Sequence, residues 1–130
     1  MGLISTYAMT PTLLAQWSHE DLAPHTIGYG VETVDGKRMG TVEDVLYDDE
    51  AGVARYVVVN TTGAEFVVNY TRILLPATLC CPNEERHTVR SEVGVEQVQR
   101  APAYDPASAL GRSYEETVFT NFGERPYWPI

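Results

Sequence analysis

Short runs of apolar and polar residues, separated by turn residues, dominate the middle of the chain. The run 27–34 ends at Asp35-Gly36, a dipeptide that tolerates positive φ and therefore favours a tight hairpin turn, and a second run, 38–47, follows at once. The second run alternates imperfectly, which leaves a helix open, but Gly40 favours a strand with a β-bulge. The pattern predicts one antiparallel pair of strands.

The strongest strand signal comes next, at residues 53–60, where β-branched residues and a tyrosine are typical of a central strand. Residues 64–69 follow a turn and predict a fourth strand that completes a meander. Two more runs are expected around 73–75 and 87–89, and Pro76 marks a strand start, edge or bulge because proline cannot donate to a ladder. The sequence thus predicts a mainly β, antiparallel fold of about six strands.

Two helices are expected after the strands. Ser91 can accept a hydrogen bond as an N-cap, and apolar residues at helical spacing follow until Pro102 ends a short helix. A proline-containing linker then leads to a second helical pattern at 113–122, which Gly123 would cap.

Composition and charge narrow the classes of function. The 130 residues, of which 44% are hydrophobic, suit one domain with its own core. With 18 acidic and 9 basic residues, the formal net charge of −9 repels phosphate backbones, so no nucleic acid partner is expected. A small basic patch around Arg86, Arg90 and Arg100 is interpreted as solvated surface charge.

The opening stretch and the cysteines indicate a compartment. Residues 1–14 carry no basic residue before their apolar positions, and their longest apolar run is far too short for a membrane span. We therefore expect neither a signal peptide nor a membrane span, and a cytoplasmic location. The adjacent Cys80 and Cys81 fit a reducing compartment better than a disulfide, and in a strand they would point to opposite faces, one buried and one exposed.

Catalytic and metal-binding motifs are not apparent in the sequence. Asp48 and Asp49, in the acidic segment 43–50, are weak candidates for Ca²⁺ or Mg²⁺ ligands, but the spacing is not that of an EF-hand and a solvated turn is the simpler interpretation. The histidines, which have no carboxylate or cysteine at ligand spacing, are His19, His25 and His87. We therefore predict no enzyme, no cofactor and no metal.

Several motifs, in their order along the chain, resemble the PRC-barrel domain family, which is named after the cytoplasmic domain of the photosynthetic reaction centre's H subunit. They are the segment 34–45 (VDGKRMGTVEDV), the strand-like segment 52–59 and Leu74-Leu75-Pro76. The segments 100–106 and 123–128 are similar to the extension found after stand-alone bacterial members. The pattern departs from the family at 77–84 and in the first residues.

The resemblance implies a small closed antiparallel barrel of about six strands. It divides the chain into an N-terminal extension over 1–26, a PRC-barrel-like domain over 27–100, and a C-terminal linker and helical tail over 101–130. Family members act as adaptors and share no catalytic motif. The resemblance therefore implies a non-enzymatic interaction or scaffold module.

Aromatic residues near the C-terminus are the predicted interaction surface, because aromatic side chains anchor interfaces; packing on the chain's own barrel explains them equally well. They are Tyr104, Tyr114, Phe119, Phe122, Tyr127 and Trp128. We predict a self-associating module, a homodimer or homo-oligomer, with a further protein partner that the sequence does not name. Two alternatives stay open: a small acidic barrel that binds a divalent cation or polar ligand, and an adaptor that binds a ribosomal protein.

Overall fold

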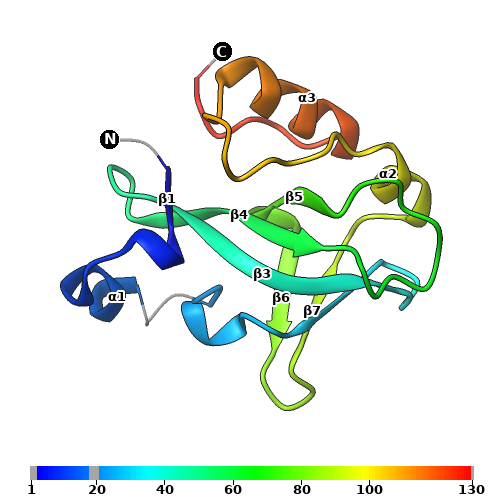
Figure 1. Ribbon diagram of the computed structural model, residues 1–130, viewed down its shortest axis with the longest axis horizontal. Coiled ribbons are helices and arrows are strands. Elements are labelled where there is room, and N and C mark those ends of the chain that lie inside the picture. Colours follow the sequence, from blue (N-terminus) through cyan, green and yellow to red (C-terminus); the bar gives the residue numbers. More distant parts are fainter. Residues whose placement is uncertain (1–2, 18–20, 130) are drawn as a thin grey trace.

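A computed structural model describes residues 3–17 and 21–129 of the chain. The strands are β1 (Leu3–Ser5), β2 (Gly30–Glu32), β3 (Arg38–Asp48), β4 (Val53–Asn60), β5 (Arg72–Pro76), β6 (Cys80–Asn83) and β7 (Thr88–Ser91). The helices are α1 (Pro11–Trp17), α2 (Val95–Arg100) and α3 (Arg112–Phe122), with single 3₁₀ turns at Thr6–Ala8, Pro24–Thr26 and Ala77–Leu79. Figure 1 shows α3 above the sheet, on the side of β4 and β5.

The seven strands form one mixed sheet in the order β5-β4-β3-β2-β7-β6, with β1 paired to the far end of β3. All pairs are antiparallel except β2 and β7, which run parallel. The β2–β3 hairpin turns at Asp35-Gly36 as predicted, and Gly36 has a φ of 85°. The first predicted hairpin is therefore confirmed.

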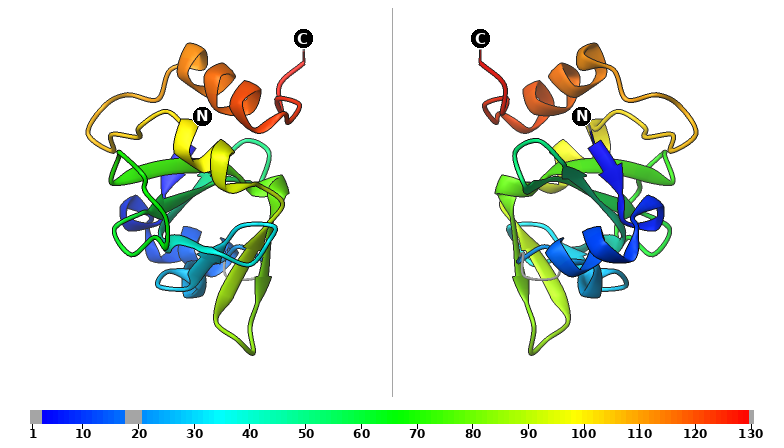
Figure 2. Two further views of the ribbon diagram at one scale, coloured as in Figure 1. Left: turned by 90° about the vertical axis from the view of Figure 1, so that its right-hand side faces the viewer. Right: turned by 90° about the vertical axis from the view of Figure 1, so that its left-hand side faces the viewer.

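The predicted closed antiparallel barrel is wrong, because the sheet stays open. β5 and β6 lie at its two ends, and no pairing joins them among the described strands. Pro76 ends β5 and Pro82 lies within β6, and neither residue has an N–H to donate to a closing ladder. The chain passes between them through the turn Ala77–Leu79, and the β6–β7 hairpin extends away from α3 (Figure 2).

β3 is a strand with a bulge, so the helical alternative for this segment is excluded. Its pairing with β2 shifts register between Val31 and Glu32, opposite Gly40 and Arg38. Gly40 has a φ of 153°, and a Cβ atom there would lie 2.1 Å from the backbone oxygen of Asn60. Glycine is required because β3 and β4 approach each other closely at this point.

The predicted fourth strand at 64–69 is wrong: the segment is a loop between β4 and β5. β5 takes the place beside β4 instead, with Ile73, Leu74 and Leu75 all buried. The loop contacts the sheet through Glu65, whose backbone N–H donates to Arg38 O (2.8 Å) and whose Oε1 accepts from Arg38 N. Residues 73–75 form the more continuously apolar run, and they occupy the buried position because their burial removes more apolar surface from water.

Both predicted helices are present, but the first begins later than expected. α2 starts after Gly94, while Ser91 ends β7 and its hydroxyl donates to Glu32 O (2.7 Å). α3 ends at Gly123, which has a φ of 65° and caps the helix as predicted. Residues that begin the chain also enter the core: the ring of Trp17, 2% exposed, stacks on Tyr47 with ring centroids 4.6 Å apart.

Candidate functional site

The aromatic tail is held on the sheet by a buried carboxylate. Glu115 of α3 is 5% exposed, and its Oε1 accepts hydrogen bonds from Tyr56 Oη (2.7 Å) and Tyr127 Oη (2.6 Å). Burial, then the hydrogen bond to Glu115, raises the pKa of Tyr127 to about 12, and the same causes raise the pKa of Tyr56. Both phenols therefore stay protonated donors at neutral pH.

Arginines pack against the outer side of this aromatic cluster. The guanidinium of Arg112 lies 3.9 Å from the ring centroid of Trp128 and 3.7 Å from Glu115. Arg55, from β4, lies 4.2 Å from the ring centroid of Tyr127. Tail, helix and sheet are joined by cation–π and charge-assisted contacts as well as apolar packing.

The six predicted interaction residues differ in how accessible they are. Phe119 and Phe122 are buried, while Tyr104, Tyr114, Tyr127 and Trp128 are partly exposed. Tyr104 and Tyr114, with ring centroids 6.4 Å apart, line a hollow of about 190 Å³ in the linker before α3. The tail thus packs on its own sheet, and a role at an interface stays a prediction for the four exposed side chains.

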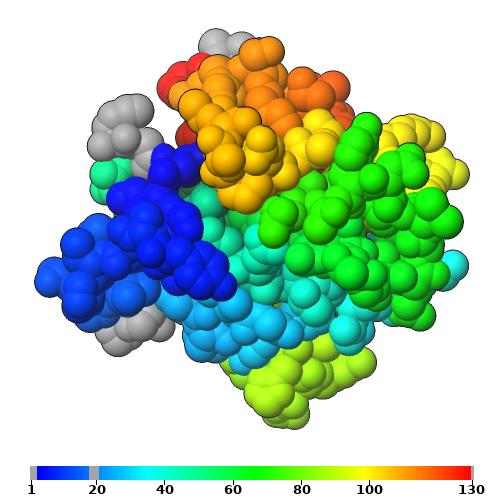
Figure 3. All heavy atoms as spheres, in the orientation of Figure 1, coloured from blue at the N-terminus to red at the C-terminus, as the bar shows by residue number. Residues whose placement is uncertain are grey.

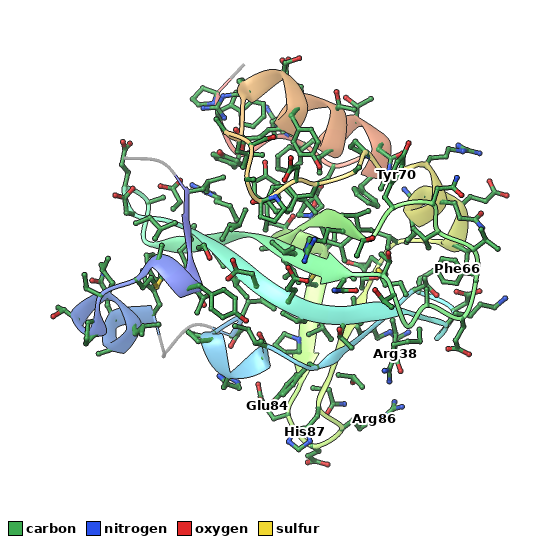
Figure 4. The ribbon with its side chains drawn as sticks, viewed as in Figure 1. Arg38, Phe66, Tyr70, Glu84, Arg86 and His87 are labelled. Atoms are coloured by element: carbon green, nitrogen blue, oxygen red, sulfur yellow. The ribbon has the colours of Figure 1, made fainter. Side chains whose placement is uncertain are left out.

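Two large side chains in and directly after the segment predicted as a strand are among the most exposed of the described residues. Val67 is 74% and Tyr70 48% exposed, and both lie on the loop 61–71 together with Phe66 (Figure 4). The loop encloses a hollow of about 390 Å³ lined by Phe66, Val68, Tyr70 and threonines. Treating the segment as a strand hid the signal, although its turn residues indicated a loop.

The loop contacts α2, and the linker contacts the first residue of β5. Gln99 Nε2 donates to Val67 O (3.0 Å), and Tyr104 N donates to Arg72 O (2.8 Å). Figure 3 shows the linker after α2, in orange, beside the loop, in green, on the same face. We call this face the tyrosine surface and define it by its partly or fully exposed apolar side chains, which are Val67, Tyr70, Tyr104 and Tyr114.

The acidic segment contributes hydrogen bonds that stabilise the turn between β3 and β4. Asp48 Oδ1 accepts from the backbone N–H of Glu50 (3.0 Å) and Ala51 (3.1 Å), and Oδ2 accepts from Arg55 Nε (3.0 Å). Burial raises the pKa of Asp48, but these hydrogen bonds outweigh it and the net shift is downward. Asp49 lies exposed beside it. Within residues 3–17 and 21–129, no three His, Cys, Asp or Glu side chains are grouped to hold a metal ion.

Histidines and cysteines occur around the β6–β7 hairpin. His25 Nε2 lies 3.0 Å from both carboxylate oxygens of Glu84, and Tyr29 Oη donates to the same carboxylate (2.7 Å). These hydrogen bonds, that of His25 first, lower the pKa of Glu84. His87 lies near Tyr29 with ring centroids 5.2 Å apart, whereas His19 falls outside the described residues.

The two cysteines of β6 point to opposite faces as predicted, although Cys80 is half-buried rather than fully buried and Cys81 is exposed. Burial raises the pKa of Cys80 to about 12, so its thiol stays protonated at neutral pH and is a poor nucleophile.

The three arginines that the sequence analysis interpreted as solvated surface charge do not lie together. Arg86 and Arg90 line one hollow on the β6–β7 side, together with the turn 33–36. Arg100 pairs instead with Glu96 (3.1 Å) on the exposed side of α2. Arg86 and Arg90 therefore share a hollow that Glu32 and Asp35 also line, and Arg100 is not part of it.

Comparison with known proteins agrees with the resemblance seen in the sequence. A family model described as the PRC-barrel domain matches residues 20–90, more than half of the 130 residues. A search of curated proteins found no match. None of the helices within the described segments has the length and apolar character needed to cross a bilayer. The family match spans the sheet from before β2 into β7, and the chain belongs to the PRC-barrel domain family.

Proposed function

We propose that this protein is a non-enzymatic protein-binding module that self-associates through the tyrosine surface. The family match supports a non-enzymatic module in general. The observation that carries the finer proposal is the exposure of Val67 (74%) and Tyr70 (48%) on a loop tied to the sheet. A second molecule that covers these large exposed apolar side chains removes apolar surface from water, which favours association.

The apolar side chains of the tyrosine surface support the proposal of a symmetric dimer. Val67, Phe66 and Val68 together line a hollow of about 390 Å³ on the loop. In a twofold contact the same patch meets itself, so apolar side chains of the two protomers can pack against each other there. Tyr70, Tyr104 and Tyr114 add aromatic area with few rotatable bonds, and aromatic residues of this kind dominate interface energies.

The loop is held in place before any partner binds. Glu65 bonds twice to the backbone of Arg38, and Thr61 Oγ1 donates to Tyr70 O at the other end. A surface fixed in this way loses less conformational freedom on association than a mobile loop does. The adjacent cysteines are both free thiols, which suits a reducing compartment, and we place this function in the cytoplasm.

The test is the molar mass of the full chain by light scattering after size exclusion. We expect a dimer with a dissociation constant on the order of micromolar. Combining Val67→Ser with Tyr70→Ser is expected to raise this dissociation constant by at least about tenfold. The matched control is Tyr7→Ser, because Tyr7 is 71% exposed but lies on the N-terminal segment. A monomeric full chain at high concentration contradicts self-association, and a dimer unchanged by the double variant contradicts the assigned surface.

The alternatives gain no specific support. Asp48, the first weak cation candidate, already uses both carboxylate oxygens within its own turn, and Asp49 stands beside it without a third carboxylate, histidine or cysteine grouped for a metal among the described residues. A ribosomal protein as partner rests on family analogy alone.

A further inference from the structure

A second surface, on the other side of the sheet from α3, has the chemistry of a ligand site. A hollow of about 370 Å³ opens where the hairpin turn at 33–36 meets β7 and the β6–β7 hairpin. Its lining residues are Glu32, Thr33, Val34, Asp35, Gly36, Asn83, Arg86, Thr88 and Arg90. The volume falls in the range of sites that hold small molecules.

The arginines around this hollow have little or no compensation. Arg90 forms no side-chain hydrogen bond or ion pair within the described part of the chain, and Arg86 reaches Glu32 at 3.8 Å only. Arg38, the register partner of Glu32 on β3, lies outside the lining of the hollow. The Nε of Arg38 is buried without a partner in the described structure. In a chain with 18 acidic residues, arginines that stay unpaired have free capacity for an external anion.

Two neutral donors complete the set. Thr88 is 7% exposed, lines the hollow, and its hydroxyl has no hydrogen-bond partner in the regions that the structure describes. Asn83 accepts from Arg86 N (3.2 Å) through Oδ1, which leaves its NH₂ group to donate. The Thr88 hydroxyl is not among the fully buried polar atoms that lack a partner in the described structure, so it faces the open hollow and can donate to a ligand there.

Two carboxylates also line the hollow, and each is already engaged. Asp35 accepts from Thr33 Oγ1 (2.5 Å), and this hydrogen bond lowers its pKa, with a contribution from nearby Lys37. Glu32 is only 16% exposed and faces Arg86. Of the two arginines that line the hollow, Arg90 is the one without an ion-pair partner among the described residues.

We propose that this hollow, the arginine hollow, binds the phosphate group of a small phosphomonoester. The guanidinium groups of Arg86 and Arg90, the Thr88 hydroxyl and the Asn83 amide carry about thirteen N–H and O–H donors, which suits the three terminal oxygens and double charge of a phosphate better than a singly charged carboxylate. The phosphate of a long nucleic acid is disfavoured, because the net charge of −9 repels the rest of the polymer. The site is independent of the self-association proposed above.

The test is an amide NMR titration of the ¹⁵N-labelled full chain at constant ionic strength. Inorganic phosphate, glycerol phosphate and acetate are the three probes, each added to about 50 mM in the presence of balancing chloride. We expect saturable shifts of the Gly36, Thr88 and Arg90 amides with both phosphate probes, with dissociation constants of roughly 1–10 mM. Three results would each overturn the proposal: shifts that rise linearly without saturation, acetate binding as tight as phosphate binding, or binding of inorganic phosphate but not of glycerol phosphate.

Variants separate binding from folding. Arg90→Gln alters an exposed side chain and is expected to weaken phosphate binding by about tenfold. Thr88→Val removes only the unpartnered hydroxyl and is expected to weaken binding several-fold while leaving the melting temperature unchanged or higher. Arg125→Gln is the matched control, because Arg125 is exposed on the tail beyond α3 and its side chain has no partner among residues 3–17 and 21–129. If Arg90→Gln binds phosphate as tightly as Arg125→Gln does, the assignment is wrong.

Discussion

Gly40 shows how much one residue decides at the crossing of β3 and β4. Its φ of 153° lies outside the region that L-residues adopt readily, and a Cβ atom would come within 2.1 Å of Asn60 O and 2.9 Å of Asn60 C. Both neighbours are backbone atoms of a central strand, so they cannot move aside without breaking the β3–β4 ladder.

Gly40→Ala is therefore expected to lower the free energy of unfolding by about 2–4 kcal/mol, measured by urea denaturation. Gly63→Ala is the control, because Gly63 has no atom within 4 Å of its Cβ position and no positive φ. Gly63→Ala is expected to change stability by less than about 1 kcal/mol. Equal effects of the two substitutions would show that β3 and β4 do not approach as closely as described.

Glu115 is the residue on which the tail depends most. Substitution by alanine removes the common acceptor of Tyr56 and Tyr127 and leaves the buried Tyr56 hydroxyl without its partner. We expect Glu115→Ala to lower the free energy of unfolding by about 2–4 kcal/mol, read from urea midpoints at constant slope. Glu116→Ala, an exposed neighbour on the same helix, should stay within about 0.5 kcal/mol, and a similar loss for both would contradict this role.

At the scale of elements, hairpin and cap residues could be read from the sequence, whereas strand partners could not. Asp35-Gly36 and Gly123 act through their own backbone conformation, so the β2–β3 turn and the end of α3 were predictable. Residues 64–69 of the loop were predicted as a strand, because the place beside β4 is taken by β5, which comes later in the chain. The arginine hollow was missed for the same reason, since parallel pairing of β2 with β7 joins residues that are far apart in sequence.

Asp48, in the turn between β3 and β4, makes the free energy of unfolding depend on pH in the acidic range. The pKa of Asp48 is lowered in the folded chain, so the carboxylate binds its proton less readily there than in the unfolded chain. Its contribution is present above the ordinary aspartate pKa near 3.8 and is lost as pH falls through and below that value.

Asp48→Asn is accordingly expected to lower the free energy of unfolding by about 1 kcal/mol at pH 7, and by clearly less near pH 3, in urea titrations at both values. Glu50→Gln, an exposed change in the same turn, is the control. A loss for Asp48→Asn that does not shrink in acid would mean that packing, rather than charge, stabilises the turn.

At the scale of the whole molecule, the β4–β5 end of the sheet is covered by α3, whereas the β6 end is not. β3 and β4 have strands on both sides, and α3 with its aromatic cluster lies over the β4–β5 end. Among the strands that the structure describes, β6 pairs with β7 alone; it contains Pro82 and belongs to a hairpin that projects from the rest (Figure 2). The sequence-based resemblance identified the family correctly but implied a closed barrel, because closure depends on a β5–β6 pairing that no local pattern encodes.

An open sheet and a closed barrel differ in how they open to solvent. In a closed barrel every strand has two neighbours, so backbone amides exchange with solvent mainly through global unfolding; an edge strand with one neighbour separates at lower cost. Hydrogen exchange followed by mass spectrometry is therefore expected to give peptides from β3 and β4 the slowest exchange, and peptides from β6 exchange that is faster by at least about tenfold. β5, the other end strand, is the internal control, because Tyr104 N bonds to Arg72 O and the linker covers its edge, so its exchange should lie between the two. Equal protection of β6 and β4 would mean that the two ends of the sheet meet in solution and that the barrel closes.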